Sequence, residues 1–253
     1  MSPSTSLGRR AFILAGIAAI GSACASTSLA VTSRSYLPVA DVKSAVDQTA
    51  ASVAPLRSSR TLDVPLYRQK LALSCEAASL RMSLAYKGIA TTEASILSLV
   101  GADTRGPYFE DAVLRWGDPY ATFVGDVNGS EVLLTGYGTY YPTIAAAAAR
   151  LGAVVLAGGQ GIAPDALYAY ILAGHPAVAW VTYEWVAATR SDYTAFDGTG
   201  IPYAGPVEHA VAIAGVSAAN VLINDPDAGQ YWIPKATFEA AYATYNQMAV
   251  VVL

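Results

Sequence analysis

The sequence predicts an α+β fold, in which a helical N-terminal part packs on a C-terminal antiparallel sheet. Helix patterns with start and stop signals lie between residues 75 and 174, and short β-rich segments follow residue 175. There is no internal repeat and no composition change after residue 60, so residues 61–253 are expected to form one domain. In this arrangement a helix end can face a sheet edge, and we expect the functional site at that interface.

The helical part begins after an extended segment over residues 62–67, in which Pro65 favours an edge position. A helix is expected over residues 75–87, with Ser74 as its N-cap, Glu76 near the positive end of its dipole and Gly88 at its end. Capping residues, prolines at first helical positions and terminal glycines predict three more helices, over residues 92–100, 142–152 and 164–174.

The C-terminal part is rich in β-branched and aromatic residues in short runs. Strands are expected over residues 176–183, 207–216, 221–225, 230–233 and 247–253. A helix over residues 234–245 is expected before the last strand.

Residues 1–30 are expected to be an export signal. Arg9 and Arg10 precede an uncharged, mostly apolar run that ends at Ala23, which is the layout of a twin-arginine signal. This run of about 13 residues is shorter than the roughly 20 needed to span a bilayer. Small residues near the end of the run suit a signal peptidase, whereas residues 20–24 resemble a lipobox that would attach a lipid to Cys24, and both outcomes stay open. The protein is therefore expected to be exported, either extracellular or associated with the cell envelope.

Residues 31–60 are rich in Ser, Thr, Ala and Val and are expected to form a linker, with a short helix over residues 39–53. Loss of Arg9 and Arg10 with the signal would change the formal net charge from −4 to −6. An acidic domain without a Lys/Arg cluster is not expected to bind nucleic acid. Membrane contact is expected only through a lipid at Cys24.

Cys75 is the most informative residue of the chain. There are two cysteines, and Cys24 lies in the leader, so Cys75 has no internal partner after export. An unpaired thiol in an exported protein is an oxidation hazard, and its presence suggests a chemical role. In the first turn of a helix Cys75 would sense partial positive charge, which favours the thiolate, and a histidine from the sheet could take its proton.

Two histidines are candidates for this base. His175 lies in a helix-to-strand turn, where a solvated or capping role is usual, whereas His209 lies at the head of an apolar strand and is preferred. A loop of about five residues after residue 214 would place Asp225 directly across from His209, and a four-residue loop would place it diagonally. Asp225 would then hold the imidazole in its working tautomer. Asn224 is a weaker candidate, because neighbouring strand residues point to opposite faces.

Acyl transfer also needs donors for the oxyanion of the tetrahedral intermediate. Gln69 lies six residues before Cys75 and could place its side-chain amide near the reacting carbonyl. The backbone N–H of Cys75 would be the second donor.

These segments resemble the secreted, stand-alone relatives of the bacteriocin-processing, double-glycine cysteine peptidases, which form cysteine peptidase family thirty-nine. The matching segments are residues 64–69, 73–78, 116–120, 123–129, 136–138, 208–211 and 224–226. The resemblance covers most of residues 61–253 and implies a papain-like cysteine peptidase fold. It also implies that Gln69 is the oxyanion residue, Cys75 the nucleophile, His209 the base and Asp225 the orienting acid.

The expected function is that of an exported thiol hydrolase that cleaves peptide bonds through an acyl-enzyme, without a metal or other cofactor. The substrate would be a peptide or protein, including cell-wall peptide, and the oligomeric state stays open. Bacteriocin processors are usually fused to a transporter and an ATPase and act inside the cell, so cleavage after a double glycine is not carried over. Two alternatives are a non-catalytic, surface-anchored binding module with the same fold and a transpeptidase that exchanges amides.

Three other features favour structural roles. Residues 126–131 faintly resemble a calcium loop but lack its third acidic position, so a glycine turn is favoured. Residues 158–161 are glycine-rich but lack the Lys-Ser/Thr of a phosphate loop, which favours an ordinary connection. Aromatic residues of the middle segment could line a substrate groove or pack in the core: Trp116, Tyr120, Tyr137, Tyr140 and Tyr141.

Overall fold

The computed structural model describes residues 58–253. The predicted export signal, lipid attachment at Cys24 and all but the end of the predicted linker lie outside these residues. None of the helices in the described part of the chain is long and apolar enough to cross a membrane.

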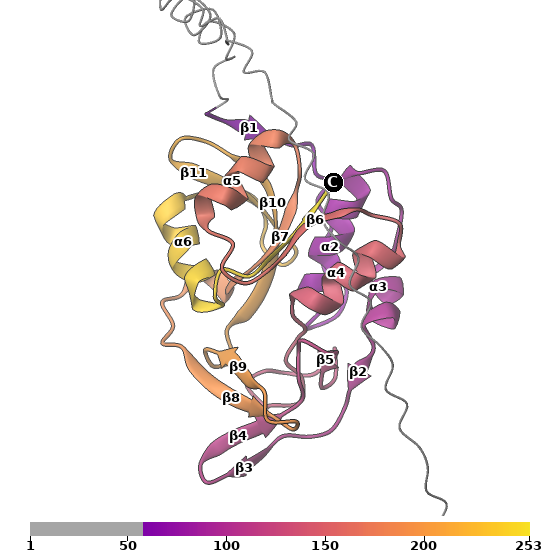
Figure 1. Ribbon diagram of the computed structural model, residues 1–253, viewed down its shortest axis with the longest axis vertical. Helices are drawn as coiled ribbons and strands as arrows, with labels where there is room; N and C mark the ends of the chain where they lie inside the picture. The colour runs from indigo at the N-terminus through magenta and orange to yellow at the C-terminus, as the bar shows by residue number, and fades with distance from the viewer. Residues whose placement is uncertain (1–57) are drawn as a thin grey trace, which may run out of the picture. The chain divides into compact units, whose positions relative to one another are not determined.

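A large antiparallel sheet forms the centre of the structure (Figure 1). Its strand order is β12-β11-β10-β7-β13-β6, and β1 pairs with β10. The bounds are β1 Arg60–Thr61, β6 Val155–Gly159, β7 Ala177–Thr182, β10 Glu208–Val216, β11 Asn220–Asp225, β12 Gly229–Pro234 and β13 Ala249–Val252. The strands predicted after residue 175 are confirmed.

Helices cover both faces of this sheet (Figure 1). The helices α2 (Cys75–Tyr86), α3 (Glu93–Val100) and α4 (Tyr141–Arg150) lie on one face, and α5 (Pro164–Ala173) and α6 (Lys235–Thr244) on the other. Successive side chains of β7 point to opposite faces of the sheet, so β7 contributes to both cores. Trp180 packs in the core on the first face and Val181 in the core on the second. All five predicted helices of the domain are confirmed.

Helix α2 lies in the interior, and most of its residues are buried. The Ser79 hydroxyl donates a hydrogen bond of 3.0 Å to the carbonyl of Ala210, which ties α2 to β10. The predicted cap is only partly right: Ser74 occupies the N-cap position, but its side chain makes no capping hydrogen bond. The Ser74 hydroxyl instead donates a hydrogen bond of 2.8 Å to the carboxylate of Glu93 in α3, which ties the two helices together.

Two smaller sheets, which we did not predict, cover the lower end of the molecule (Figure 1). One pairs β2 (Ala102–Asp103) with β5 (Phe123–Val124), and the other has the order β3-β4-β8-β9. The bounds of the second sheet are β3 Tyr108–Glu110, β4 Val113–Trp116, β8 Ser191–Ala195 and β9 Gly200–Tyr203. The parallel pairing of β4 with β8 joins segments about eighty residues apart, a contact that local sequence patterns do not encode.

Three local expectations are corrected. The predicted extended segment over residues 62–67 is not a strand. Only β1, just before it, pairs with β10, and the N–H of Leu62 then donates a hydrogen bond to the carbonyl of Ala214. The glycine-rich segment 158–161 is not simply a connection, because Gly158 and Gly159 belong to the edge strand β6. After β7 the chain forms a short 3-10 helix, η1 (Tyr183–Trp185), where strand 176–183 was expected to continue.

Candidate active site

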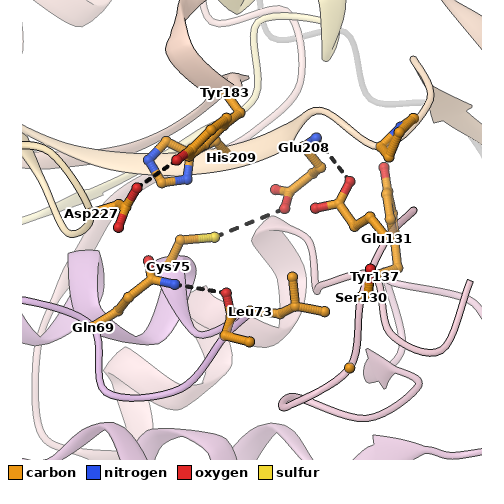
Figure 2. Close-up of a pocket in the computed structure, with 13 residues that line it drawn as sticks. Gln69, Leu73, Cys75, Ser130, Glu131, Tyr137, Tyr183, Glu208, His209 and Asp227 are labelled. Atoms are coloured by element: carbon orange, nitrogen blue, oxygen red, sulfur yellow. Dashed lines mark hydrogen bonds between the residues drawn. The ribbon is translucent and has the colours of Figure 1, made fainter. Parts of the chain in front are cut away.

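One cavity, with a volume of about 360 Å³, lies between the N-terminal end of α2 and the beginning of β10 (Figure 2). Gln69, Cys75 and His209 line it, and Asp225 contacts His209 directly. The structure therefore brings together all four residues that the sequence predicted for a catalytic site.

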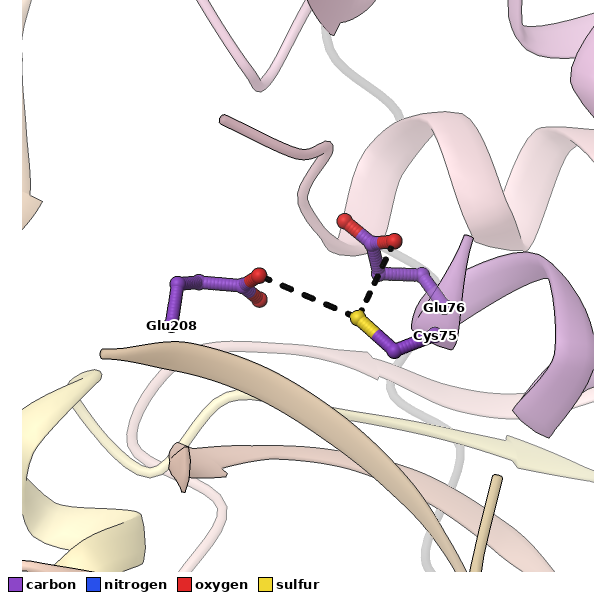
Figure 3. Close-up of side chains that lie close together, drawn as sticks. All are labelled: Cys75, Glu76 and Glu208. Carbon is purple, nitrogen blue, oxygen red and sulfur yellow. Dashed lines mark hydrogen bonds between the residues drawn. The ribbon is translucent and has the colours of Figure 1, made fainter. Parts of the chain in front are cut away.

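Cys75 is the first residue of α2 and is 5% exposed. Its sulfur lies 3.4 Å from Oε2 of Glu76 and 3.9 Å from Oε2 of Glu208 (Figure 3). Burial raises the pKa of the thiol well above its ordinary value, and the charges of Glu76 and Glu208 raise it further. This differs from the expected activation by the helix terminus, because the neighbouring carboxyls oppose the thiolate that the helix dipole favours.

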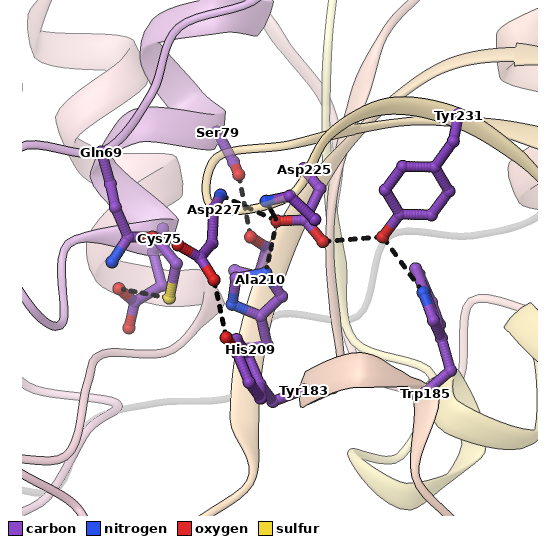
Figure 4. Close-up of polar contacts among 12 residues, drawn as sticks. Gln69, Cys75, Ser79, Tyr183, Trp185, His209, Ala210, Asp225, Asp227 and Tyr231 are labelled. Atoms are coloured by element: carbon purple, nitrogen blue, oxygen red, sulfur yellow. Dashed lines mark hydrogen bonds and ion pairs between the residues drawn. The ribbon is translucent and has the colours of Figure 1, made fainter.

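His209 lies next to Cys75 in the cavity and is held from the opposite side. Its Nε2 lies 2.9 Å from Oδ1 of Asp225, and both side chains are almost fully buried. The second ring nitrogen faces the side of the cavity on which Cys75 lies (Figure 4). The ring of Tyr183 packs edge-on against the imidazole, with ring centroids 5.3 Å apart. The imidazole thus has a fixed orientation, with one nitrogen at the acid and the other at the cavity.

Asp225 is fixed by a network of donors (Figure 4). Its Oδ1 accepts the backbone N–H groups of Asp227 and Ala228 at 2.8 and 3.1 Å, and its Oδ2 accepts the Tyr231 hydroxyl at 2.8 Å. The indole N–H of Trp185 donates to the same hydroxyl at 3.1 Å. Burial alone would raise the pKa of the Asp225 carboxyl, but the hydrogen bonds from His209 and the backbone outweigh it and lower the pKa well below its usual range.

The hairpin register corrects the predicted alignment of this pair. Ala212 pairs with Asn224, so Asp225 is not directly across from His209. The two residues are diagonal neighbours, as the shorter loop predicted, and their side chains span the diagonal. Asn224 points elsewhere: its amide donates to the carbonyl of Val64 at 2.9 Å.

Gln69 lies in the cavity wall, but its amide is engaged within its own loop. Nε2 donates to the carbonyls of Leu71 and Ala72 at 3.0 and 2.9 Å, and the side-chain oxygen Oε1 is buried without a partner. The backbone N–H of Gln69 donates to the carbonyl of Pro226, which ties this loop to the turn after Asp225. To act as an oxyanion donor, the amide would have to release one of its two present acceptors.

Three carboxyls that were not predicted as site residues lie beside Cys75; Glu76, Glu131 and Glu208 form this group, the carboxyl cluster. Glu76 follows the cysteine and Glu208 precedes the histidine, and this adjacency was the available signal. Glu131 comes from the distant loop after β5, and its Oε2 accepts the backbone N–H of Glu208 at 3.1 Å. Only the tertiary structure brings Glu131 to the other two.

Burial raises the pKa of all three carboxyls in this cluster. It raises the pKa of Glu76 to about 7, against the hydrogen bond of 2.5 Å that Glu76 accepts from the N–H of Thr139. Burial raises the pKa of Glu131 to about 8, and the charge of Glu76 adds to the effect. Burial and the charges of the other two raise the pKa of Glu208 well above its ordinary value. The cluster therefore holds protons near neutral pH that exposed carboxyls would release.

The remaining candidates lie outside this arrangement. His175 follows α5 and lies 3.4 Å from the amine of Lys87, at the far end of α2. In the segment that resembles a calcium loop, Asp126 accepts the N–H of Asn128 in a turn, while Glu131 joins the carboxyl cluster. Of the aromatic residues of the middle segment, Tyr137 both packs in the core and lines the cavity.

The arrangement has the parts needed for acyl transfer by a thiol: a sulfur at a helix N-terminus, an oriented imidazole and a nearby amide. Among the described residues, one group of potential metal ligands also lies here, with atoms of Cys75, Glu76 and Glu208 within 4.8 Å of one another. A metal bound there would occupy the sulfur that acyl transfer requires.

The chain is similar in sequence to one protein family and in structure to several solved proteins. The sequence pattern of the Peptidase_C39 like family matches residues 61–250. A protein from Bacillus anthracis described as a C39-like peptidase has a similar structure, with a TM-score of 0.64 and 24% sequence identity over 78% of this chain and 98% of that chain.

Two further solved structures are more distant. The peptidase domain of the Streptococcus bi-functional ABC transporter ComA has a TM-score of 0.45 and 15% identity over 74% of this chain and 96% of its own. Xylellain, a cysteine protease from Xylella fastidiosa, has a TM-score of 0.42 and 14% identity over 86% of this chain and 90% of its own. No curated protein sequence matches this chain.

Proposed function

Because this chain belongs to the Peptidase_C39 like family and has a papain-like α+β fold, we propose that it is a cysteine peptidase that hydrolyses peptide bonds through an acyl-enzyme. One observation carries the proposal. Cys75 at the N-terminus of α2 and the His209–Asp225 pair meet at one cavity large enough for part of a peptide.

In the proposed reaction His209 takes the thiol proton, and the sulfur of Cys75 attacks the carbonyl carbon of the scissile bond. The resulting oxyanion accepts hydrogen bonds from the backbone N–H of Cys75 and from the Gln69 amide, which turns from its loop carbonyls. When the carbon–nitrogen bond breaks, His209 returns the proton to the leaving amine. His209 then takes a proton from water as the water attacks the thioester, the carbon–sulfur bond breaks to release the carboxylic acid, and His209 returns the proton to the sulfur.

The resting structure adds one condition to this scheme. The thiol contacts Glu76 and Glu208, and the charges of these carboxyls oppose its ionisation. Proton transfer to His209 is therefore expected to need either protonated carboxyls or a bound positive charge that neutralises them. The contact of the sulfur with carboxyls is also the observation that favours the alternative, a binding module without turnover.

Alkylation of Cys75 separates the two candidates. Full-length protein with Cys24→Ala, which leaves Cys75 as its one thiol, is treated with iodoacetamide at pH 7.5, and the rate is measured by mass spectrometry. His209→Ala is expected to slow the reaction at least tenfold, whereas His175→Ala, which removes the other histidine, should leave it unchanged. Equal rates in all three proteins would refute the role of His209 and favour the binding module.

Hydrolysis itself needs a second assay. The protein and its Cys75→Ser variant are incubated with a mixed peptide library, and the products are compared by mass spectrometry. Cleavage products that require Cys75 support hydrolysis, and joined products would indicate transpeptidation instead. We further propose that the protein acts after export, which fractionation of cells that produce the full chain would test.

A further inference from the structure

We propose that the carboxyl cluster binds a primary ammonium group of the substrate, carried by the residue whose carbonyl is attacked. This proposal adds a substrate preference to the proposed function. It rests on that function only for the direction in which the substrate lies across Cys75. These carboxyls lie at the cavity on one side of Cys75, and Glu208 among them has an oxygen without a hydrogen-bond partner in the described part of the chain.

The carboxyl cluster has no ion-pair partner within the part of the chain that the structure describes. None of the ion pairs among residues 58–253 involves Glu76, Glu131 or Glu208. Glu208 is 4% exposed, its Oε1 has no hydrogen-bond partner, and its Oε2 has only the contact of 3.9 Å with the Cys75 sulfur. A buried carboxylate without partners is costly, so such a group is expected to serve a ligand that supplies the missing donors.

Glu131 and Glu208 line the cavity directly, and Glu76 lies next to them beside the sulfur (Figures 2 and 3). The backbone is shaped around these carboxyls, because a Cβ at Gly138 would come within 2.6 Å of Glu76 and 3.0 Å of Glu208. Leu73 and Tyr137 provide apolar surface in the same wall. Carboxylates behind an apolar wall suit a group with a methylene stem and an ammonium end.

The direction follows from the two sides of Cys75. Figure 2 shows His209 on one side of the sulfur and Glu208 with Glu131 on the other. His209 must protonate the leaving amine, so the leaving part of the substrate lies on its side. The acyl part then extends toward the carboxyl cluster. Its ammonium is either a lysine-type side chain or the free amino terminus of that residue, and both sources offer the same chemistry.

The electrostatics agree with this assignment. Burial raises the pKa values of the three carboxyls, and a bound ammonium would favour their charged forms instead. The same positive charge would offset the effect of Glu76 and Glu208 on the Cys75 thiol. Substrate binding would thereby help to ionise the nucleophile, which a neutral substrate would not do.

The test measures binding without turnover. Full-length Cys75→Ser protein is titrated in EDTA at pH 7.5 with three compounds, and chemical shifts are followed by NMR. Nα-acetyl-lysine methylamide presents a side-chain ammonium, norleucine methylamide presents an amino-terminal ammonium, and Nα-acetyl-norleucine methylamide presents neither. One of the first two is expected to bind at least tenfold more tightly than the third, and the one that does identifies the source.

Variants locate the preference. Glu131→Gln and Glu208→Gln are each expected to reduce the affinity ratio between the preferred ammonium compound and the neutral compound to less than threefold. Glu110→Gln, which removes an exposed carboxylate paired with Arg115, should leave it unchanged. Equal affinity for all three compounds, binding of none, or a preference that survives both substitutions would overturn the inference.

The outcome is separable from that of the proposed function. An ammonium preference in the absence of any Cys75-dependent hydrolysis would leave the site standing and refute the peptidase. Cys75-dependent hydrolysis of peptides without an ammonium preference would support the peptidase and refute the ammonium site.

Discussion

Replacing Glu76 with glutamine should make the protein markedly more stable at alkaline pH. Burial raises the pKa of Glu76 from 4.5 to about 7, so the folded protein holds a proton that the unfolded chain releases above pH 4.5. Stability from this group is therefore complete below pH 4.5 and is lost as the pH rises toward 7. A difference of about 2.5 pKa units corresponds to about 3 kcal/mol of unfolding free energy.

The amide in Glu76→Gln does not ionise, so this loss should disappear. Its oxygen can still accept the N–H of Thr139, and its nitrogen would take the place of Oε2 beside the Cys75 sulfur, a weak acceptor. Relative to the parent, the variant should gain about 3 kcal/mol of stability between pH 4 and pH 8.5. Because Glu76 also raises the pKa values of Glu131 and Glu208, its removal should add to this gain.

Urea unfolding of the full-length reduced protein, followed by tryptophan fluorescence, measures this difference. With a slope of about 2 kcal/mol per molar urea, the midpoint of the variant should rise by about 1.5 M relative to the parent between pH 4 and pH 8.5. Glu110→Gln, at an exposed ion pair, should change the free energy by less than about 1 kcal/mol at either pH. If Glu76→Gln and the parent lose the same stability on going to pH 8.5, the carboxyl is not buried in the way described.

Two further predictions concern the support of the site. Gly138→Ala would place a Cβ 2.6 Å from Oε1 of Glu76 and should lower stability by about 1–3 kcal/mol in the same urea assay, whereas Gly159→Ala, with open space around its added Cβ, should change it little. Asp225→Ala should lower kcat/KM for any substrate that depends on Cys75 by about 10²–10⁴-fold. In Asp225→Asn the amide oxygen can take the place of Oδ1 and still accept from His209, while the amide nitrogen would donate to the Tyr231 hydroxyl, so this variant should lower kcat/KM less. Tyr231→Phe should lower it by about tenfold or less. Equal losses in Asp225→Asn and Asp225→Ala would show that charge rather than orientation is the contribution of Asp225.

Several parts of the site could be inferred from local sequence, because each depends on neighbours along the chain. The helix that begins at Cys75 has its periodic apolar residues and an acidic residue in its first turn, and the structure contains it. The β10–β11 hairpin follows from two apolar runs and a short loop, and it brings Asp225 to His209. Its register differed from the preferred alignment because Val216 and Val221 are the last paired residues, so the turn begins two residues later than the loop expected after residue 214.

Other features depend on contacts between distant segments. The sheet of β3, β4, β8 and β9 joins residues before 120 to residues after 190, and the short strands carry no pattern strong enough to predict the pairing. The side-chain amide of Gln69 was expected to be free for an oxyanion, but its loop folds back and engages it. Local spacing places a residue near a site without deciding which partners its atoms take.

The sequence by itself determined the α+β order of elements and pointed to Gln69, His209 and Asp225 as neighbours of Cys75, since hydrophobic periodicity, caps and turns act over a few residues. The tertiary structure alone decided the electrostatic environment of that thiol. Glu76 and Glu208 are neighbours of Cys75 and His209 in sequence, yet only the packing of α2 against β10 buries both carboxyls beside the sulfur. Burial removes water from around these groups, and the resulting pKa shifts depend on three-dimensional distance rather than on sequence spacing.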